Sequence, residues 1–232
     1  MRKILFIIIF ITTTSQAQFR GMFGRNTIIN DENFDKQRYH FGYTLGFNSY
    51  DFKINYNAPG KDIIVRTTTG FNVGLVANKR INESFNLRFE PGLYVTQRNI
   101  GFPGFVTRAE SEREVKSTYI HFPLLLKYSA ERIGNVRPYL VAGVGTALNL
   151  SSNANVPEDN SSGVFKTNKW TNFYEVGVGI DLYLEYFKFS PSVRGIFGMN
   201  DELIRDNNPN SAWTGNVASM QTRGVFVNFT FH

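Results

Sequence analysis

The feature that most constrains this chain is a two-residue alternation over residues 119–150. Over residues 120–128 every even-numbered residue is large and apolar, whereas the odd-numbered ones include His121 and Lys127. After a short polar turn the alternation returns, with Gly143 and Gly145 on the face opposite the aliphatic residues. A period of two is that of a β-strand, so the stretch predicts a long antiparallel hairpin. An apolar face opposite a face of glycine and charge is typical of a strand between lipid and a filled interior.

The same alternation recurs along the chain and predicts eight strands in all. They cover about residues 40–54, 64–78, 84–96, 119–128, 137–150, 170–184, 186–197 and 218–232. The longest connections are predicted at residues 97–114, 151–169 and 198–216. Apart from the first pair, long and short connections alternate, as in a barrel with tight turns at one end and extended loops at the other. We therefore predict an all-β fold over residues 39–232, an eight-stranded antiparallel transmembrane β-barrel with a filled polar interior.

Glycine parity supports this interpretation, because the strand glycines share the face that carries the charges. They are Gly42, Gly46, Gly70, Gly74, Gly92, Gly143, Gly145, Gly177, Gly179 and Gly224. In a narrow barrel such glycines leave room for large interior side chains. The alternative is a soluble, lipocalin-like barrel with its apolar face inside, but the large apolar side chains would overfill that lumen. The membrane orientation is the one we expect.

The N-terminus carries a separate signal. Arg2 and Lys3 precede an apolar run over residues 4–11, and Ser15, Gln16 and Ala17 form a small-x-small cleavage site. We interpret residues 1–17 as a signal peptide. An uncleaved anchor is the alternative, although the run is shorter than the roughly 20 residues that span a bilayer.

Residues 18–38 have mixed charge and no sustained period, and we predict an N-terminal periplasmic segment that acts as a tether or plug. The chain has no cysteine, which excludes disulfides and a lipid-modified cysteine. Its net charge of +6 is scattered rather than clustered, so nucleic-acid binding is not indicated.

The ionisable residues on the inward face form a nearly balanced set. They are Arg88, Glu90, His121, Lys127, Glu175, Asp181, Lys188 and Arg194. A closed interior requires buried charges to be paired, so we predict a structural polar network, with a proton or ion path as the alternative. Aromatic residues near predicted strand ends are expected to form interfacial belts: Tyr50, Phe52, Tyr94, Tyr119, Tyr128, Trp170, Tyr174, Tyr183 and Tyr186.

No pattern typical of catalysis or of a cofactor site appears, so we expect no enzyme activity, catalytic residue, metal, cofactor or small-molecule substrate. One alternative is an enzyme acting on lipid A, for which His121 is the candidate. Apolar residues in otherwise polar loops, Phe102, Phe105 and Trp213, are the possible partner contacts.

Residues 119–128 (YIHFPLLLKY), followed by residues 137–145 (RPYLVAGVG), resemble the core motif of the small outer-membrane β-barrel superfamily of Bacteroidetes. Residues 39–54 (YHFGYTLGFNSYDFKI) resemble the opening strand of the PorT family of the type IX secretion system, and residues 228–232 (NFTFH) resemble its closing strand. The resemblance implies a non-enzymatic component in the cell outer membrane. That component is needed for secretion or surface maturation of proteins with C-terminal secretion signals.

The resemblance also implies partners, namely outer-membrane lipid and other secretion-system proteins of the outer membrane or periplasm. It supplies no catalytic residues. The alternative function is that of a generic small outer-membrane barrel for membrane integrity or adhesion. A passive porin is weaker still, because eight strands leave no room for a water channel.

Overall fold

The computed structural model describes residues 29–60 and 62–232. The predicted signal peptide and residues 18–28 lie outside them. The described part contains the strand segments β1 (Tyr39–Tyr56), β2 (Ile64–Thr67), β3 (Thr69–Arg80), β4 (Phe85–Phe89), β5 (Gly92–Gly101), β6 (Glu112–Ser129), β7 (Val136–Asn149), β8 (Trp170–Tyr183), β9 (Lys188–Gly198) and β10 (Val217–Phe231). Three short helices complete it: η1 (Phe34–Lys36), α2 (Arg108–Ser111) and η2 (Asn160–Ser162).

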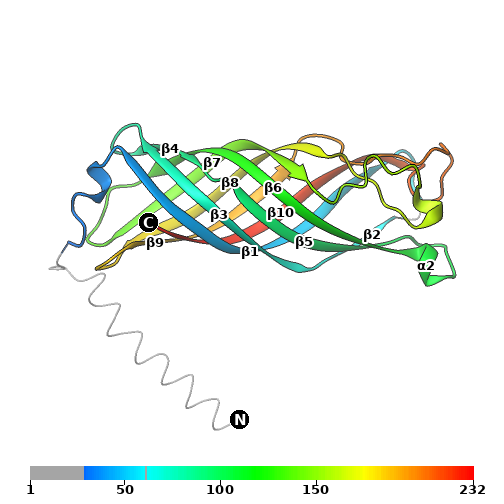
Figure 1. Ribbon diagram of the computed structural model, residues 1–232, viewed down its shortest axis with the longest axis horizontal. Helices are drawn as coiled ribbons and strands as arrows, with labels where there is room; N and C mark the ends of the chain where they lie inside the picture. Colours follow the sequence, from blue (N-terminus) through cyan, green and yellow to red (C-terminus); the bar gives the residue numbers. More distant parts are fainter. Residues whose placement is uncertain (1–28, 61) are drawn as a thin grey trace, which may run out of the picture.

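These segments form a closed antiparallel ring. Each strand from β6 to β10 pairs with its neighbours in the sequence, and β1 pairs with both β10 and β3. The pairing of β1 with both β10 and β3 closes the ring, as a barrel in lipid requires, and β2 continues this wall by pairing with β5 at the long-loop end. Figure 1 shows an elongated barrel of inclined strands, with the C-terminus and η1 at one end and α2 at the other.

Two interruptions explain why ten segments make eight strands. Between β4 and β5 the ladder stops at Pro91, which has no backbone N–H to donate. Between β2 and β3 the register against β5 shifts by one residue at Thr68, whose hydroxyl donates to the Gln97 carbonyl at 2.6 Å. With β2–β3 and β4–β5 each counted as one strand, the predicted eight-stranded barrel is confirmed.

The apolar face points outward, which confirms the membrane orientation over the lipocalin-like alternative. Phe41 and Leu75 are 73% and 66% exposed, whereas Arg88 and Arg194 are 0% and 1% exposed. Large apolar residues exposed on neighbouring strands form a continuous band around the barrel, as a lipid-facing surface does. The described residues contain no helix with both the length and the apolar character needed to cross a bilayer.

Several strands extend beyond the apolar band. On β1 the outward residues change from aromatic and aliphatic to Asp51 and Lys53, and on β6 the outward Glu114 and Lys116 precede the aliphatic positions. The part of the barrel that carries α2 and the long loops therefore has a polar outer wall.

This extension accounts for one wrong boundary. Residues 97–114 were predicted as a loop, but β5 continues to Gly101 and β6 begins at Glu112. Outside the band both faces of a strand carry polar residues. The alternation of apolar and polar residues, on which the prediction depends, is therefore absent there. The strand persists because its inward residues, including Arg98 and Ile100, remain buried.

The predicted aromatic belts are correct for some residues and wrong for others. Outward-facing Tyr128, Tyr174, Tyr186 and Trp170 are exposed, Tyr186 to 86%. Five others are at most 3% exposed and lie inside the barrel: Tyr50, Phe52, Tyr94, Tyr119 and Tyr183. On each strand these residues alternate in step with the inward-facing polar and charged residues, so their side chains also point into the barrel.

Candidate functional site

The interior of the barrel is the natural place to look for a site, and it is filled by successive layers of side chains. Nearest the short-turn end, Asp181 contacts two lysines, Lys127 at 2.5 Å and Lys188 at 3.6 Å. The Ser190 hydroxyl donates to the other carboxylate oxygen at 2.6 Å. The Lys127 ammonium also lies 3.8 Å from the centre of the Tyr139 ring. One carboxylate thus compensates two buried cations, which burial would otherwise destabilise strongly.

A second ionic layer follows along the barrel axis. Glu90 accepts hydrogen bonds from Arg88 at 2.9 Å and from Arg194 at 2.5 and 3.0 Å. The Arg194 guanidinium also lies 3.5 Å from Glu175. These four side chains come from β4, β8, β9 and the β4–β5 junction, so the layer connects opposite walls of the barrel.

His121 was predicted with the charged set, but the structure places it apart from the ion pairs, among aromatic rings. Its Nε2 lies 3.1 Å from the Tyr50 hydroxyl, and its ring stacks on Tyr94 with centroids 4.2 Å apart. Phe173 packs at 4.8 Å, and the remaining void beside His121 is about 10 Å³. At 2% exposure the imidazole has no room for a lipid substrate. The geometry therefore gives no support to lipid A chemistry at His121.

Arg98, which the sequence analysis missed, forms the next layer. It is 0% exposed and donates to the Tyr119 hydroxyl at 2.5 Å and to Thr222 Oγ1 at 3.1 Å. Its guanidinium carbon lies 3.8 Å from the centre of the Phe52 ring, close enough for a cation–π contact. The sequence does contain a signal for Arg98: it continues the even-numbered, inward-facing series of Arg88, Gly92, Tyr94 and Thr96.

A buried carboxylate, Glu202, completes this layer from the loop before β10. Thr222 donates to it through its backbone N–H at 2.9 Å and its hydroxyl at 2.7 Å. Burial raises the pKa of the Glu202 carboxyl, and the nearby Arg98 charge acts in the opposite direction. Thr222 therefore links a buried cation to a buried acid that are not in direct contact.

The long-loop end is closed by an apolar cluster. Its buried members are Phe52, Ile100, Phe102, Val115, Phe165, Leu203, Val217 and Met220. They come from β1, β5, β6, β10 and three loops, so the loops fold over the mouth of the barrel.

The predicted partner contacts divide accordingly. Phe102 is 3% exposed, belongs to the apolar cluster and also lines the groove beside Phe105 and Trp213, so its contact with a partner stays a prediction. Phe105 and Trp213 are half-buried and stack with centroids 4.9 Å apart and planes at 9°. They line a groove of about 390 Å³ at the tip of the long-loop end.

The described part of the N-terminal segment closes the opposite end. Asp35 pairs with Arg137 at 3.3 Å and accepts a hydrogen bond from the Tyr183 hydroxyl at 2.7 Å. The Phe34 ring lies 4.4 Å from the Lys188 ammonium and so covers the first ionic layer. The lumen is thus covered at both ends.

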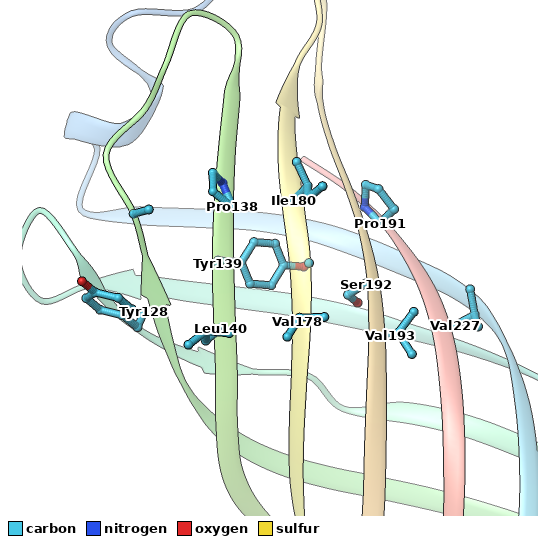
Figure 2. Close-up of a pocket in the computed structure, with 12 residues that line it drawn as sticks. Tyr128, Pro138, Tyr139, Leu140, Val178, Ile180, Pro191, Ser192, Val193 and Val227 are labelled. Atoms are coloured by element: carbon cyan, nitrogen blue, oxygen red, sulfur yellow. The ribbon is translucent and has the colours of Figure 1, made fainter.

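A depression of about 610 Å³ in the lipid-facing wall lies over β7, β8 and β9. Figure 2 shows Tyr139 reaching from β7 toward β8, with Ser192 on the neighbouring β9. The β8–β9 pairing lapses between Gly179↔Ser192 and Leu182↔Phe189, next to Pro191. The lining is almost entirely apolar, so the depression suits hydrocarbon rather than a polar ligand. Among the described residues there is no group of three or more metal-ligating side chains.

Comparison with known proteins gives one family. A family model described as "Outer membrane protein beta-barrel domain" matches residues 16–203. A search of curated proteins finds no match.

Solved structures with a similar arrangement are distant in sequence. OprG from Pseudomonas aeruginosa is 18% identical, with 84% of this chain and 96% of that chain covered and a TM-score of 0.45. Neisserial surface protein A is 10% identical, with coverages of 81% and 95% and a TM-score of 0.43. AlkL is 16% identical, with coverages of 90% and 92% and a TM-score of 0.42.

Proposed function

The chain belongs to the outer membrane protein beta-barrel domain family, and from that premise we propose that it is a non-enzymatic barrel that acts through protein contacts at its two ends. The protein resides in the outer membrane. In the proposal the short-turn end faces the periplasm and the long-loop end faces outward. The observation that carries the proposal is the filled lumen: ionic layers, aromatic rings and an apolar cluster occupy it from end to end.

The filling supports a binding role in preference to transport or catalysis. Glu90, Asp181 and Arg194 are each at most 1% exposed and are held by partners from other strands. A permeation path would require these pairs to separate, at a cost of several kcal/mol for each buried charge. The surfaces open to a partner are therefore the ends and the outer wall.

We further propose that the partners are outer-membrane or periplasmic proteins of the type IX secretion system. In this role the barrel is needed for secretion or surface maturation of proteins with C-terminal secretion signals. The support is the resemblance of residues 39–54 to the opening strand of the PorT family. The exposed groove with Phe105 and Trp213 and the covering segment at residues 29–38 are the contact surfaces that we propose.

Deletion of the gene tests this role, with surface delivery of a reporter that carries a C-terminal secretion signal as the measurement. We expect delivery to fail, and to be restored by the wild-type gene. Complementation with Phe105→Ser/Trp213→Ser tests the outer surface, because these changes remove half-buried rings without touching the ionic layers. Val106→Ser is a matched control, since that side chain is fully exposed and lies in the same loop. Unchanged delivery in the deletion strain would contradict the secretion role.

A generic role in membrane integrity or adhesion is the second candidate. The observation that favours it is the polar outer wall and the folded loops beyond the apolar band, which form a surface able to contact the environment. In that case the deletion strain would deliver the reporter normally but would become sensitive to detergents or lose attachment to surfaces.

A further inference from the structure

A cluster of four cations lies at the short-turn end of the barrel, where β1 begins and β3 ends. Lys36, Arg38, Lys79 and Arg80 line a cleft of about 650 Å³, together with Ile81, Asn82 and Glu83. Lys36, Arg38 and Lys79 are exposed, and Arg80 is half-buried. We propose that this cleft binds the phosphate of an anionic phospholipid headgroup in the periplasmic leaflet.

Strand pairing holds the cations together. Tyr39 lies opposite Lys79 in the β1–β3 register, and the Arg80 N–H donates to the Arg38 carbonyl at 2.9 Å. Arg38 and Arg80 thus stand across from each other on the same face. Like charges directly opposite one another destabilise a strand pair, and a bound anion would relieve that repulsion.

Within the described residues none of the four cations forms an ion pair. Lys36 donates to the Asn33 side chain at 3.1 Å, and Arg80 donates to the carbonyls of Lys36 and Asn82, both at 3.3 Å. Glu83 lines the cleft but lies beyond 4.0 Å from each cation, whereas the lumen cations Arg88, Lys127, Lys188 and Arg194 each contact an acid. The four cations of this cleft therefore carry exposed positive charge that no described acid within 4.0 Å neutralises, and they are free to attract an external anion.

The position of the cleft identifies the anion. Tyr39 and Ile81 are 52% and 58% exposed beside it, and the apolar band begins directly above with Phe41 and Leu75. Tyrosine and basic side chains at that level lie among lipid headgroups. Basic residues near an anionic bilayer surface contribute about 1 kcal/mol each. A phosphate that is already anchored at this depth by its acyl chains fits better than a free phosphate ion.

The test uses the mature chain reconstituted in phosphatidylcholine vesicles that contain a trace of spin-labelled lipid. The measurement is the association constant for labelled phosphatidylglycerol relative to labelled phosphatidylcholine. We expect the wild type to prefer phosphatidylglycerol, and Arg38→Gln/Lys79→Gln to reduce that preference roughly ten- to thirtyfold. A matched control, Lys53→Gln/Arg66→Gln, removes two exposed cations near the other end and should leave the preference unchanged.

A charge-conserving variant and two competition arms complete the design. Arg38→Lys/Lys79→Arg should retain the preference, and about 1 M salt should abolish it in the wild type, since the Debye length then falls to about 3 Å. Equal association of the two lipids with the wild type would overturn the proposal, and so would a preference that persists in 1 M salt. Displacement of the labelled lipid by millimolar inorganic phosphate would assign the cleft to free anions and overturn the lipid assignment. This measurement is independent of secretion, so its failure would leave the proposed function untouched.

Discussion

At the scale of single residues, the interior depends on a few side chains that satisfy several partners at once. Asp181 is the clearest case, because it is the acid that contacts Lys127 and Lys188, and all three are at most 3% exposed. Glu90 has the same role between Arg88 and Arg194. Removal of Asp181 would leave two buried lysines facing each other, whereas after removal of Glu90 Arg194 would still have Glu175 at 3.5 Å.

We expect Asp181→Asn to lower the free energy of unfolding by about 3–5 kcal/mol, because the change leaves two buried lysines without a negatively charged partner in a site shielded from water. The measurement is the urea midpoint in lipid vesicles, followed by tryptophan fluorescence. Asp62→Asn makes the same chemical change at an exposed position and should shift stability by less than about 0.5 kcal/mol. Equal midpoints for the two variants would show that the lysines do not depend on Asp181.

Gly179 is fixed by packing rather than by charge. A Cβ atom there would lie 2.4 Å from Tyr139 Cζ and 2.7 Å from the Pro191 carbonyl oxygen, too close for either to remain in place. We expect Gly179→Ala to cost about 1–3 kcal/mol by overpacking. At Gly101 the nearest atoms are 3.6 Å away, so Gly101→Ala is the matched control and should cost little. The same urea titration decides; a Gly179→Ala protein as stable as the control would mean that Tyr139 can move aside freely.

At the scale of elements, the strands are longer than the bilayer requires. β1 and β6 each span 18 residues, and their ends beyond the apolar band hold the loops that close the mouth. β5 pairs with β6 as far as Gly101 and also with β2. The outer part of the barrel is therefore built from regular ladders that lie outside the lipid.

Hydrogen exchange tests that extension. We expect the amides of residues 96–101 to exchange slowly, because β5 lies between β2 and β6 there. The amides of residues 103–107 should exchange fast, since that segment lies outside the strands. Mass spectrometry of peptides from the reconstituted protein gives both rates in one sample. Similar exchange rates in the two segments would contradict the extended strand and favour the predicted loop over residues 97–114.

At the scale of the whole molecule, the barrel has its polar residues inside and its apolar residues outside. The lumen holds Arg88, Arg98, Lys127, Lys188 and Arg194 against Glu90, Glu175, Asp181 and Glu202, five positive and four negative groups, all at most 3% exposed. The outer face contacts lipid within the apolar band and water beyond it. A charged side chain on the outer face therefore costs free energy inside the band but little outside it.

Leu75→Arg and Val106→Arg separate these environments. Both side chains are exposed, Leu75 to 66% in the apolar band and Val106 to 102% in the β5–β6 loop. We expect Leu75→Arg to cost about 1–3 kcal/mol in lipid vesicles, because this position lies in the apolar band between the interface and the bilayer midplane, and Val106→Arg to be nearly neutral. Unfolding free energies measured side by side give the answer. A neutral Leu75→Arg would contradict the lipid-facing assignment of the whole band.

The sequence by itself determined the period, the parity and therefore the fold. A residue's side of a strand depends only on whether its number is odd or even, so the inward direction of Arg88 and Asp181 follows from local sequence. The difference in polarity between the two faces is weak where both carry polar residues. For this reason the predicted strand ended at residue 96, and Arg98 was assigned to a loop.

Only the tertiary structure decided which inward residues meet. Glu90 and Arg194 are 104 residues apart and Lys127 and Asp181 are 54 apart, and each pair comes together across the lumen. Such contacts depend on the stagger of strands around the closed ring, which no local pattern records. For the same reason the sequence grouped His121 with the charges, whereas the register placed it among aromatic rings.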